Sequence, residues 1–283
     1  MRNMFLQLRM IIAELAIGLS VVTLSCSDNA KKQENAMDNQ NLRNELDALR
    51  SKRIFFGHQS VGANVVTGLK DLLSTVPDVH LNMVSLTDSA FPSGPVFVDT
   101  YIGENSQPKT KCDAFTSRVT ELSASFDLAL MKFCYIDLTE GTDVEDLFTY
   151  YRDTIQELKR RCPNVKLVHV TVPLTRRGAS WKVLVKKLLG RIEYNDIANL
   201  KREEFNRLLV HFYKDEPVFD LASIESTFPD GTRNSFSQEG KTGYSLIDEY
   251  ADDGDHLGPL GRELAARELV HTLAAACGRT PGK

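Results

Sequence analysis

The sequence predicts an α/β protein in which a parallel sheet of about five strands is covered by helices on both faces, a three-layer αβα sandwich. Short apolar runs typical of buried strands, such as Ile54–Phe56 and Lys166–Val172, alternate with stretches of helical periodicity. The run Asp127–Tyr135 is almost continuously apolar, as expected of a central parallel strand. Strands that alternate with helices favour a parallel sheet, because each helix carries the chain back to the start of the next strand.

The first residues are typical of an export signal. Arg2 and Arg9 accompany the mainly apolar stretch Met10–Leu24, which is too short for a comfortable transmembrane helix. The stretch leads to Cys26 in a sequence that resembles the bacterial lipobox, whose cysteine is lipidated and becomes the mature N-terminus. An ordinary cleaved signal peptide and an uncleaved anchor are the alternatives.

Three segments are therefore predicted. Residues 1–26 form a lipoprotein signal peptide, residues 27–41 a polar flexible tether, and residues 42–283 a single domain. The protein is expected to be exported and to be held by an N-terminal lipid at a membrane of the cell envelope, in the periplasm or at the outer membrane.

A strand-to-helix junction at Ser60 is the first candidate for chemistry. The apolar run ends at Gly57, and from Val61 apolar residues recur at the spacing of a helix face. A serine at such a junction lies at the carboxyl edge of the sheet, beside the unpaired N–H groups of a helix start. That arrangement suits a nucleophilic serine with part of an oxyanion hole, and the alternative is that Ser60 only caps the helix.

The remaining elements follow in order. A strand is predicted at Val79–Leu86, and a connection rich in Pro, Gly and Ser at Thr87–Thr110. After these come predicted helices at 115–122, 143–161 and 205–212, and strands at 127–135, 166–172 and 218–221.

The second candidate for chemistry lies just before the last predicted helix. Asp253 and His256 share one tight loop, and Pro259 suits the first turn of the helix that follows. A carboxylate three residues before a histidine can hydrogen-bond the imidazole, which leaves its other nitrogen to take a proton from a hydroxyl. A solvated acidic loop is the alternative.

Composition and charge narrow the classes of function. A net charge of -4 argues against a nucleic-acid binder. The acidic residues around Asp253 make a metal-dependent hydrolase an alternative, although neither an HExxH spacing nor a complete EF-hand pattern occurs. Four further cysteines allow three disulfide pairings or buried free thiols, and no CxxC spacing favours zinc: Cys112, Cys134, Cys162 and Cys277.

The stretches around Ser60 and His256 resemble conserved blocks of the SGNH/GDSL hydrolase family. Gly57 to Ser60 is similar to the family's first block, with one extra residue between glycine and serine. The stretch from Asp253 to His256 resembles its last block, and the likeness spans residues 53–277. The resemblance implies a flavodoxin-like sheet and a Ser60–His256–Asp253 triad that hydrolyses esters through an acyl-enzyme, without a cofactor.

The middle blocks of that family are less well matched. Gly103 could supply its backbone N–H to the oxyanion, together with the N–H of Ser60. The family's third block has an asparagine after the central strand, where this chain has Ile136. Asn105, two residues after Gly103, is the candidate for the missing amide donor.

Four further residues are candidates for lining the site: His58, Gln59, Lys132 and Asp137. Lys132 lies within an apolar strand and needs a carboxylate partner, for which Glu104 and Asp137 are candidates.

The function predicted from these residues is a cell-envelope esterase. Its substrate is a small-molecule or glycan ester, with O-acetyl groups on a glycan suggested by the habit of the family. The alternative is a catalytically degenerate SGNH-like lipoprotein that binds a glycan or another envelope partner, since Ile136 removes one oxyanion donor.

Overall fold

The computed structural model of the chain describes residues 39–86, 92–122, 126–177, 194–238, 240–252 and 254–278. The chain divides into a short N-terminal unit that ends at Asn44 and a large unit from Glu45 onward. The predicted signal peptide and most of the tether lie outside the described residues, so their boundaries stay predictions. Within the described ranges, no helix is long and apolar enough to cross a membrane.

The large unit is built on a six-stranded sheet with the order β2-β3-β1-β4-β5-β6. All five neighbouring pairs run parallel, which confirms the predicted class of sheet. If the edge strand β2 is left out and the other five strands are numbered in sequence order, their order across the sheet is 2-1-3-4-5, the flavodoxin-like order. The strands are β1 (Arg53–His58), β2 (Met83–Ser85), β3 (Val96–Tyr101), β4 (Leu128–Met131), β5 (Lys166–Val170) and β6 (Val218–Phe219).

Strand β3 corrects one sequence prediction. Residues Val96–Tyr101 were expected to lie in the connection Thr87–Thr110, yet they form the strand directly beside β1. The strand predicted at Val79–Leu86 exists only as the three-residue edge strand β2. The Pro and Gly residues around 92–95 punctuate the chain as in a loop, and they mask the fully buried run Val96–Val98.

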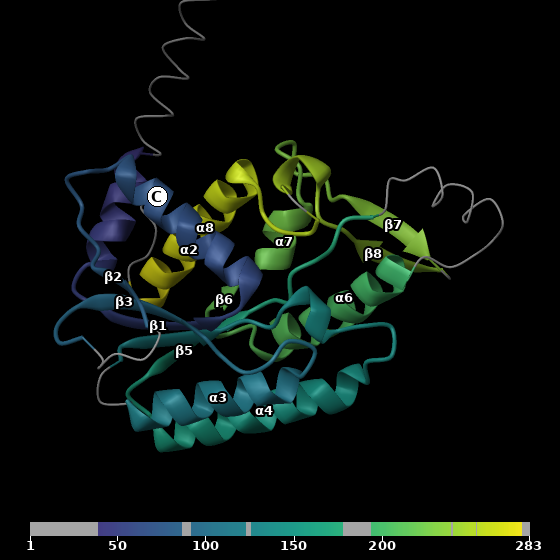
Figure 1. Cartoon of the computed structure of the whole chain (residues 1–283), viewed down its shortest axis with the longest axis horizontal. Helices are drawn as coiled ribbons and strands as arrows, with labels where there is room; N and C mark the ends of the chain where they lie inside the picture. The colour runs from purple at the N-terminus through teal and green to yellow at the C-terminus, as the bar shows by residue number, and fades with distance from the viewer. Residues whose placement is uncertain are drawn as a thin grey trace, which may run out of the picture. The chain divides into compact units, whose positions relative to one another are not determined.

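Helices cover both faces of the sheet, as predicted (Figure 1). Helices α2 (Ser60–Ser74) and α8 (Pro259–Ala276) lie on one side, and α3 (Pro108–Glu121) and α4 (Val144–Arg161) lie on the other. Helix α6 (Tyr194–Phe212) packs against α4. The remaining elements are short: α7 (Leu221–Ser226), the hairpin of β7 (Ser235–Gln238) and β8 (Lys241–Tyr244), and 3-10 turns at Tyr135–Asp137 and Asp248–Tyr250.

The close packing of α2 on α8 depends on a glycine. A Cβ atom at Gly68 would lie 2.3 Å from the carbonyl oxygen of Arg262, so only glycine lets the two helices approach this closely. Because α2 begins at Ser60 and α8 follows the His256 loop, this contact holds the two segments with the predicted chemistry on one side of the sheet.

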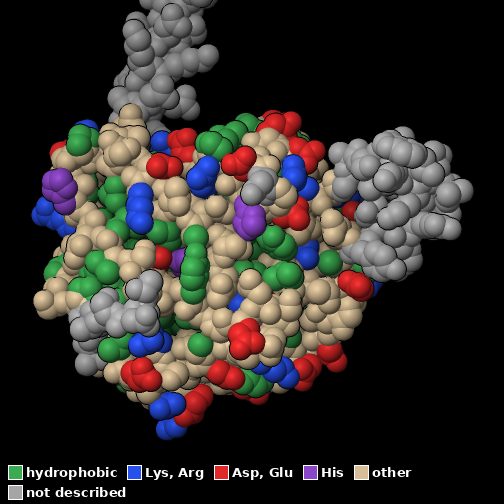
Figure 2. All heavy atoms as spheres, viewed as in Figure 1, with side chains coloured by type: hydrophobic (Ala, Val, Ile, Leu, Met, Phe, Trp, Pro, Cys, Tyr) green, Lys and Arg blue, Asp and Glu red, His purple; other side chains and the backbone are tan. Residues whose placement is uncertain are grey.

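On the face shown in Figure 2, acidic and basic side chains are interspersed and no broad basic area appears. That distribution agrees with the small net charge of -4.

The cysteines of the described residues are free thiols, which resolves the alternatives left open by the sequence. Cys112, Cys134 and Cys162 are buried and Cys277 is partly buried. Burial raises the pKa of the Cys112 thiol, so this side chain behaves as a small apolar residue of the core.

A buried histidine lies in the core beneath α4. The Nδ1 atom of His169 is 2.9 Å from the Tyr151 hydroxyl, and its Nε2 atom is 3.2 Å from Oε2 of Glu216. Its ring stacks on Tyr213 with 3.6 Å between the centroids. Burial lowers the pKa of His169 to about 4, because an imidazolium here would lose its hydration.

We expect His169 to make the stability of the protein depend on pH. An unfolded histidine takes up a proton near pH 6.5, whereas folded His169 resists protonation down to about pH 4. Stability is therefore fully present above pH 6.5 and is lost as the pH falls from 6.5 to 4, by roughly 3 kcal/mol at most. Urea unfolding at several pH values measures this. Between pH 6.5 and 4 the unfolding free energy should fall more steeply with decreasing pH in wild type than in His169→Phe, and an equal pH dependence would contradict the lowered pKa of His169.

Candidate active site

Ser60 is the first residue of α2, and Gln59 occupies the N-cap position. The carbonyl oxygen of Gln59 accepts the N–H of Gly62 at 2.8 Å and that of Ala63 at 3.3 Å. Ser60 therefore is not the cap that the alternative interpretation required. Its own N–H is among the groups at a helix start that lack an intrahelical partner. The side chain is partly exposed at the carboxyl end of β1.

The loop that carries His256 is closed on itself and docked on α2. The Asp252 N–H donates to the carbonyl oxygen of His256 at 2.9 Å. The Leu257 N–H donates to Oδ1 of Asn64 at 3.3 Å, and Asn64 lies one helical turn beyond Ser60. The structure thus holds the backbone next to His256 against the helix that Ser60 begins. The His256 ring is partly exposed and meets the Tyr135 ring edge-on at 6.1 Å.

Asp253, the predicted third member of the triad, lies outside the described residues. Its neighbour Asp255 is described, and its Oδ1 atom accepts the backbone N–H of Arg176 at 2.8 Å. This bond ties the His256 loop to the segment that follows β5. Helix α2 and the segments that follow β4 and β5 therefore all contact the His256 loop.

The loop that carries Gly103 is bound by Gln59, the residue that precedes Ser60. The Nε2 atom of Gln59 donates to the carbonyl oxygens of Ile102 at 3.1 Å and Gly103 at 3.0 Å. The Ile102 N–H donates to the carbonyl oxygen of His58 at 3.1 Å. The loop after β3 is thus attached to the residues on the N-terminal side of Ser60, and Gln59 links the two.

Gly103 is expected to tolerate no side chain. Its φ of +55° favours glycine, and a Cβ atom there would lie 2.6 Å from the backbone nitrogen of Lys111. Gly231 is a matched control, since it has a φ of +84° and no atom within 4 Å of a Cβ. Gly231→Ala should cost about 1 kcal/mol in unfolding free energy and Gly103→Ala more than about 2 kcal/mol. Chemical denaturation checks this, and equal losses would show that the approach to Lys111 is unimportant.

His58 was a candidate for lining the site, and the structure buries it instead. Its side chain is 1% exposed, with Nε2 3.2 Å from Oδ2 of Asp99 and Nδ1 3.0 Å from the carbonyl oxygen of Gln59. Burial raises the pKa of Asp99, but hydrogen bonds with His58 and Ser85 outweigh that effect and lower it below its usual value. His58 supports the turn before Ser60 from within the protein.

Lys132 is also buried, and its expected partners were wrong. Its Nζ atom donates to the carbonyl oxygen of Phe133 at 3.0 Å and to Sγ of Cys134 at 3.5 Å. Of the two expected carboxylates, Glu104 accepts from Gln107 and Asp137 from Lys111. Burial lowers the pKa of Lys132, and the neighbouring thiol opposes this.

Several functional candidates were missed at the sequence level because they are charged residues on apolar helix faces. Lys111 precedes buried Phe115 by one turn, and Arg202 precedes Phe205 by three residues. Arg202 donates from Nε to the carbonyl oxygen of Tyr135 at 2.9 Å, and burial lowers the pKa of Arg202 to about 10. The sequence feature that could have identified both residues is a charged side chain within the apolar face of a predicted helix.

Glu225 in α7 is a further buried charge near this edge of the sheet. Its Oε2 atom accepts the Leu174 N–H at 2.6 Å. Burial raises the pKa of Glu225 to about 8, and the positive charges of Lys132 and Arg202 oppose that rise.

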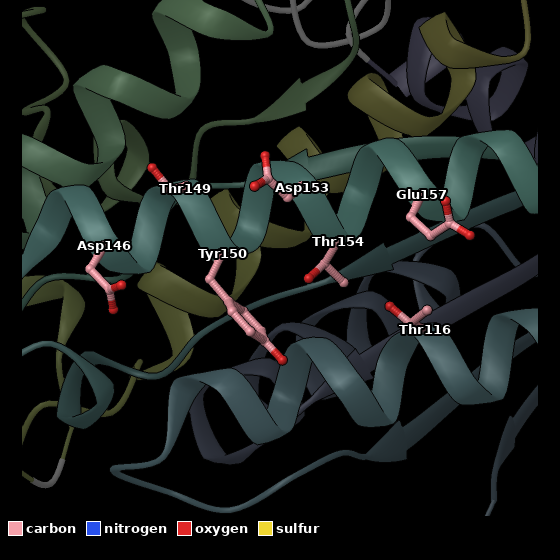
Figure 3. A pocket seen from close by; sticks show the side chains of 7 residues that line it. All are labelled: Thr116, Asp146, Thr149, Tyr150, Asp153, Thr154 and Glu157. Carbon is pink, nitrogen blue, oxygen red and sulfur yellow. The ribbon is translucent and has the colours of Figure 1, made fainter.

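A separate groove lies between α3 and α4 (Figure 3). It is lined by hydroxyl and carboxylate side chains: Thr116, Asp146, Thr149, Tyr150, Asp153, Thr154 and Glu157. None of the predicted site residues lines it. Within the ranges that the structure describes, no three His, Cys, Asp or Glu side chains are grouped to hold a metal ion.

Comparison with known proteins finds similar structures only. No protein-family model matches the sequence, and no curated protein does. A carbohydrate esterase of family 3 from Talaromyces cellulolyticus is 11% identical with a TM-score of 0.48, covering 80% of this chain and 97% of its own. An acetyl esterase is 10% identical with a TM-score of 0.46 and the same two coverages, 80% and 97%.

A third similar structure is the periplasmic domain of a lipopolysaccharide acetyltransferase from Salmonella Paratyphi A. It is 13% identical with a TM-score of 0.45, and the match covers 79% of this chain and 84% of that domain. At such identities and TM-scores, the function of this chain has to be derived from the residues of its own site.

Proposed function

We propose that this protein is a serine hydrolase that cleaves carboxylic esters. The observation that carries the proposal is the docking of the His256 loop on α2, through Leu257 and Asn64, one turn from Ser60. A serine at a helix start whose N-cap residue makes no side-chain capping bond, and a histidine on an adjacent loop, are the two groups that acyl transfer needs.

The mechanism proceeds by an acyl-enzyme. Oγ of Ser60 attacks the ester carbonyl while His256 takes the hydroxyl proton, and Asp253 orients the imidazole. The N–H groups of Ser60 and Gly103 and the amide of Asn105 stabilise the negative oxygen. The intermediate collapses, and the alcohol leaves with the proton from His256. Water, activated by His256, then releases the carboxylic acid and restores Ser60. The cycle uses no cofactor.

The finer proposal is that the ester is an O-acetyl group on a glycan of the cell envelope. An exported enzyme held by a lipid would meet such polymers, and an acetyl ester requires little space beside Ser60.

The lipid anchor makes a prediction of its own. In a bacterial host, the wild type should incorporate radioactive palmitate and sediment with membranes, because Cys26 would carry acyl chains. Cys26→Ala should incorporate no label. Equal labelling of wild type and variant would contradict lipidation at Cys26.

The esterase proposal is tested by turnover of 4-nitrophenyl acetate by the wild type, starting at Ser27. We expect saturable release of 4-nitrophenol that is unchanged by a chelator, since no metal takes part. Release of acetate from acetylated glycans then tests the finer proposal. Absence of turnover in a folded protein would contradict the esterase, and loss of turnover on chelation would favour a metal hydrolase.

A second candidate function is favoured by Ile136. Ile136 is 44% exposed, and its side chain has no hydrogen-bond donor where the resembled family has an oxyanion donor. If Asn105 does not replace that donor, the site binds a glycan without cleaving it. A folded wild type that binds acetylated glycan in calorimetry without releasing acetate would support this binding function.

A further inference from the structure

We infer that Lys111 is a positioning residue that orients the side-chain amide of Asn105 toward the oxyanion, which rests on the function proposed above. Nζ of Lys111 donates to Oδ1 of Asn105 at 3.0 Å and to Oδ2 of Asp137 at 2.5 Å. The side chains of Lys111 and Asp137 are both 0% exposed, whereas Asn105 is at the surface.

The bond from Lys111 to Oδ1 of Asn105 also determines where the N–H donors of that amide point. A carboxamide carries its acceptor oxygen and its two N–H donors on opposite sides. Because a buried ammonium holds the oxygen of Asn105 from the protein side, the N–H donors face outward. Asn105 follows Gly103 by two residues, and the carbonyl of Gly103 is bound by Gln59, the neighbour of Ser60. The outward amide is thus on the loop that Gln59, the residue before the proposed nucleophile, binds.

Asp137 fixes the loop that carries Asn105. Its Oδ1 atom accepts the N–H of Ser106 at 2.9 Å, and its Oδ2 atom accepts the N–H of Cys134 at 2.6 Å. The loop after β3 is thereby joined to the loop after β4. Ser106 has a φ of +65°, a conformation that a serine rarely adopts without such support.

Ile136 explains why an amide donor is needed from Asn105. The side chain of Ile136 has no hydrogen-bond donor, and the residue next to it, Asp137, binds both Lys111 and the loop that carries Asn105. The chain thus supplies an amide from the loop after β3 where the resembled family supplies one from the loop after β4. A buried ion pair alone is weak evidence of a stabilising role, because apolar residues of similar volume often serve stability as well.

The test is a set of variants measured for kcat, KM and thermal unfolding on 4-nitrophenyl acetate. Asn105→Ala should lower kcat roughly a hundredfold with little change in KM, because the donor acts in the transition state. Lys111→Met combined with Asp137→Asn removes both charges together and should lower kcat about tenfold or more. Lys109→Met, on the exposed face of the same helix, is the matched control and should leave kcat unchanged.

Combining these changes separates positioning from simple stabilisation. If Lys111 acts through Asn105, the two charge-removing substitutions should lower kcat no further once Asn105 is alanine. The inference would be overturned if the losses of kcat from Asn105→Ala and from Lys111→Met/Asp137→Asn multiplied in the combined variant. Unchanged kcat in a folded Lys111→Met/Asp137→Asn variant would also overturn it.

A second measurement serves if that variant does not fold. In ¹⁵N-labelled wild type, one Asn105 side-chain amide proton should shift downfield when Ser60 is phosphonylated, and an unshifted signal would overturn the inference. A wild type that hydrolyses the ester while Asn105→Ala keeps full kcat would overturn the inference alone. A folded wild type without turnover would overturn the proposed function as well.

Discussion

Replacing Ser60 by alanine is expected to abolish ester hydrolysis, with kcat falling roughly 10⁴- to 10⁶-fold. The loss should be this large because the hydroxyl forms the covalent bond to the acyl group, and no neighbouring side chain can take over that step. The residual rate would reflect binding and the oxyanion donors alone. Steady-state kinetics on 4-nitrophenyl acetate measure the change.

The fold of that variant should be intact. Ser60 makes no side-chain hydrogen bond among the described residues, and the first turn of α2 is closed by the carbonyl oxygen of Gln59, which accepts the N–H groups of Gly62 and Ala63. Ser74→Ala, at the other end of the same helix, is the matched control, because the Ser74 hydroxyl bonds the nearby carbonyl oxygen of Asp71. Full turnover by folded Ser60→Ala would exclude Ser60 as the nucleophile.

Replacing His256 by alanine should lower kcat by roughly 10⁴-fold or more, because both proton transfers pass through its imidazole. The combined Ser60→Ala/His256→Ala variant should be no slower than either single variant, since the two groups act as a unit. Steady-state kinetics on the same ester provide both comparisons.

His211→Ala, which changes an exposed histidine in the last turn of α6, is the control and should keep the wild-type rate. A His256→Ala variant with near wild-type kcat would place the general base elsewhere. Thermal unfolding of each variant should match that of wild type, because the bonds that close and dock the loop use backbone atoms of His256, Leu257 and Gly258, which alanine at position 256 retains.

The sequence predicted the class of fold because the central strands are strongly apolar and each is followed by a helix or turn of clear pattern. Strand β3 escaped prediction, since Pro92, Gly94 and Pro95 precede it and resemble a loop. The hairpin of β7 and β8 escaped for a similar reason, because its strands carry few apolar residues. In both cases pairing with a distant or adjacent strand, rather than local preference, decides the structure.

The parts of the candidate site that lie just before a helix could be predicted from the sequence. The contacts between side chains on different loops could not. Ser60 and His256 stood out by their places before two helices. The contact of Lys111 with Asn105 and Asp137 depends on the packing of α3 against the loops after β3 and β4, which no spacing in the sequence records. Lys132 was expected to pair with a carboxylate, but burial beside Cys134 and a backbone carbonyl accommodates it instead.

The most direct test of the central claim is the site of reaction with a fluorophosphonate, which labels activated serines. The reacted protein, digested with trypsin, should carry the added mass on the peptide Ile54–Lys70, in which Ser60 is the single serine. Ser60→Ala and His256→Ala should remain unlabelled, and Ser74→Ala should be labelled like the wild type. A folded wild type that takes up no label, or takes it up on another peptide, would contradict the assignment of Ser60 as nucleophile.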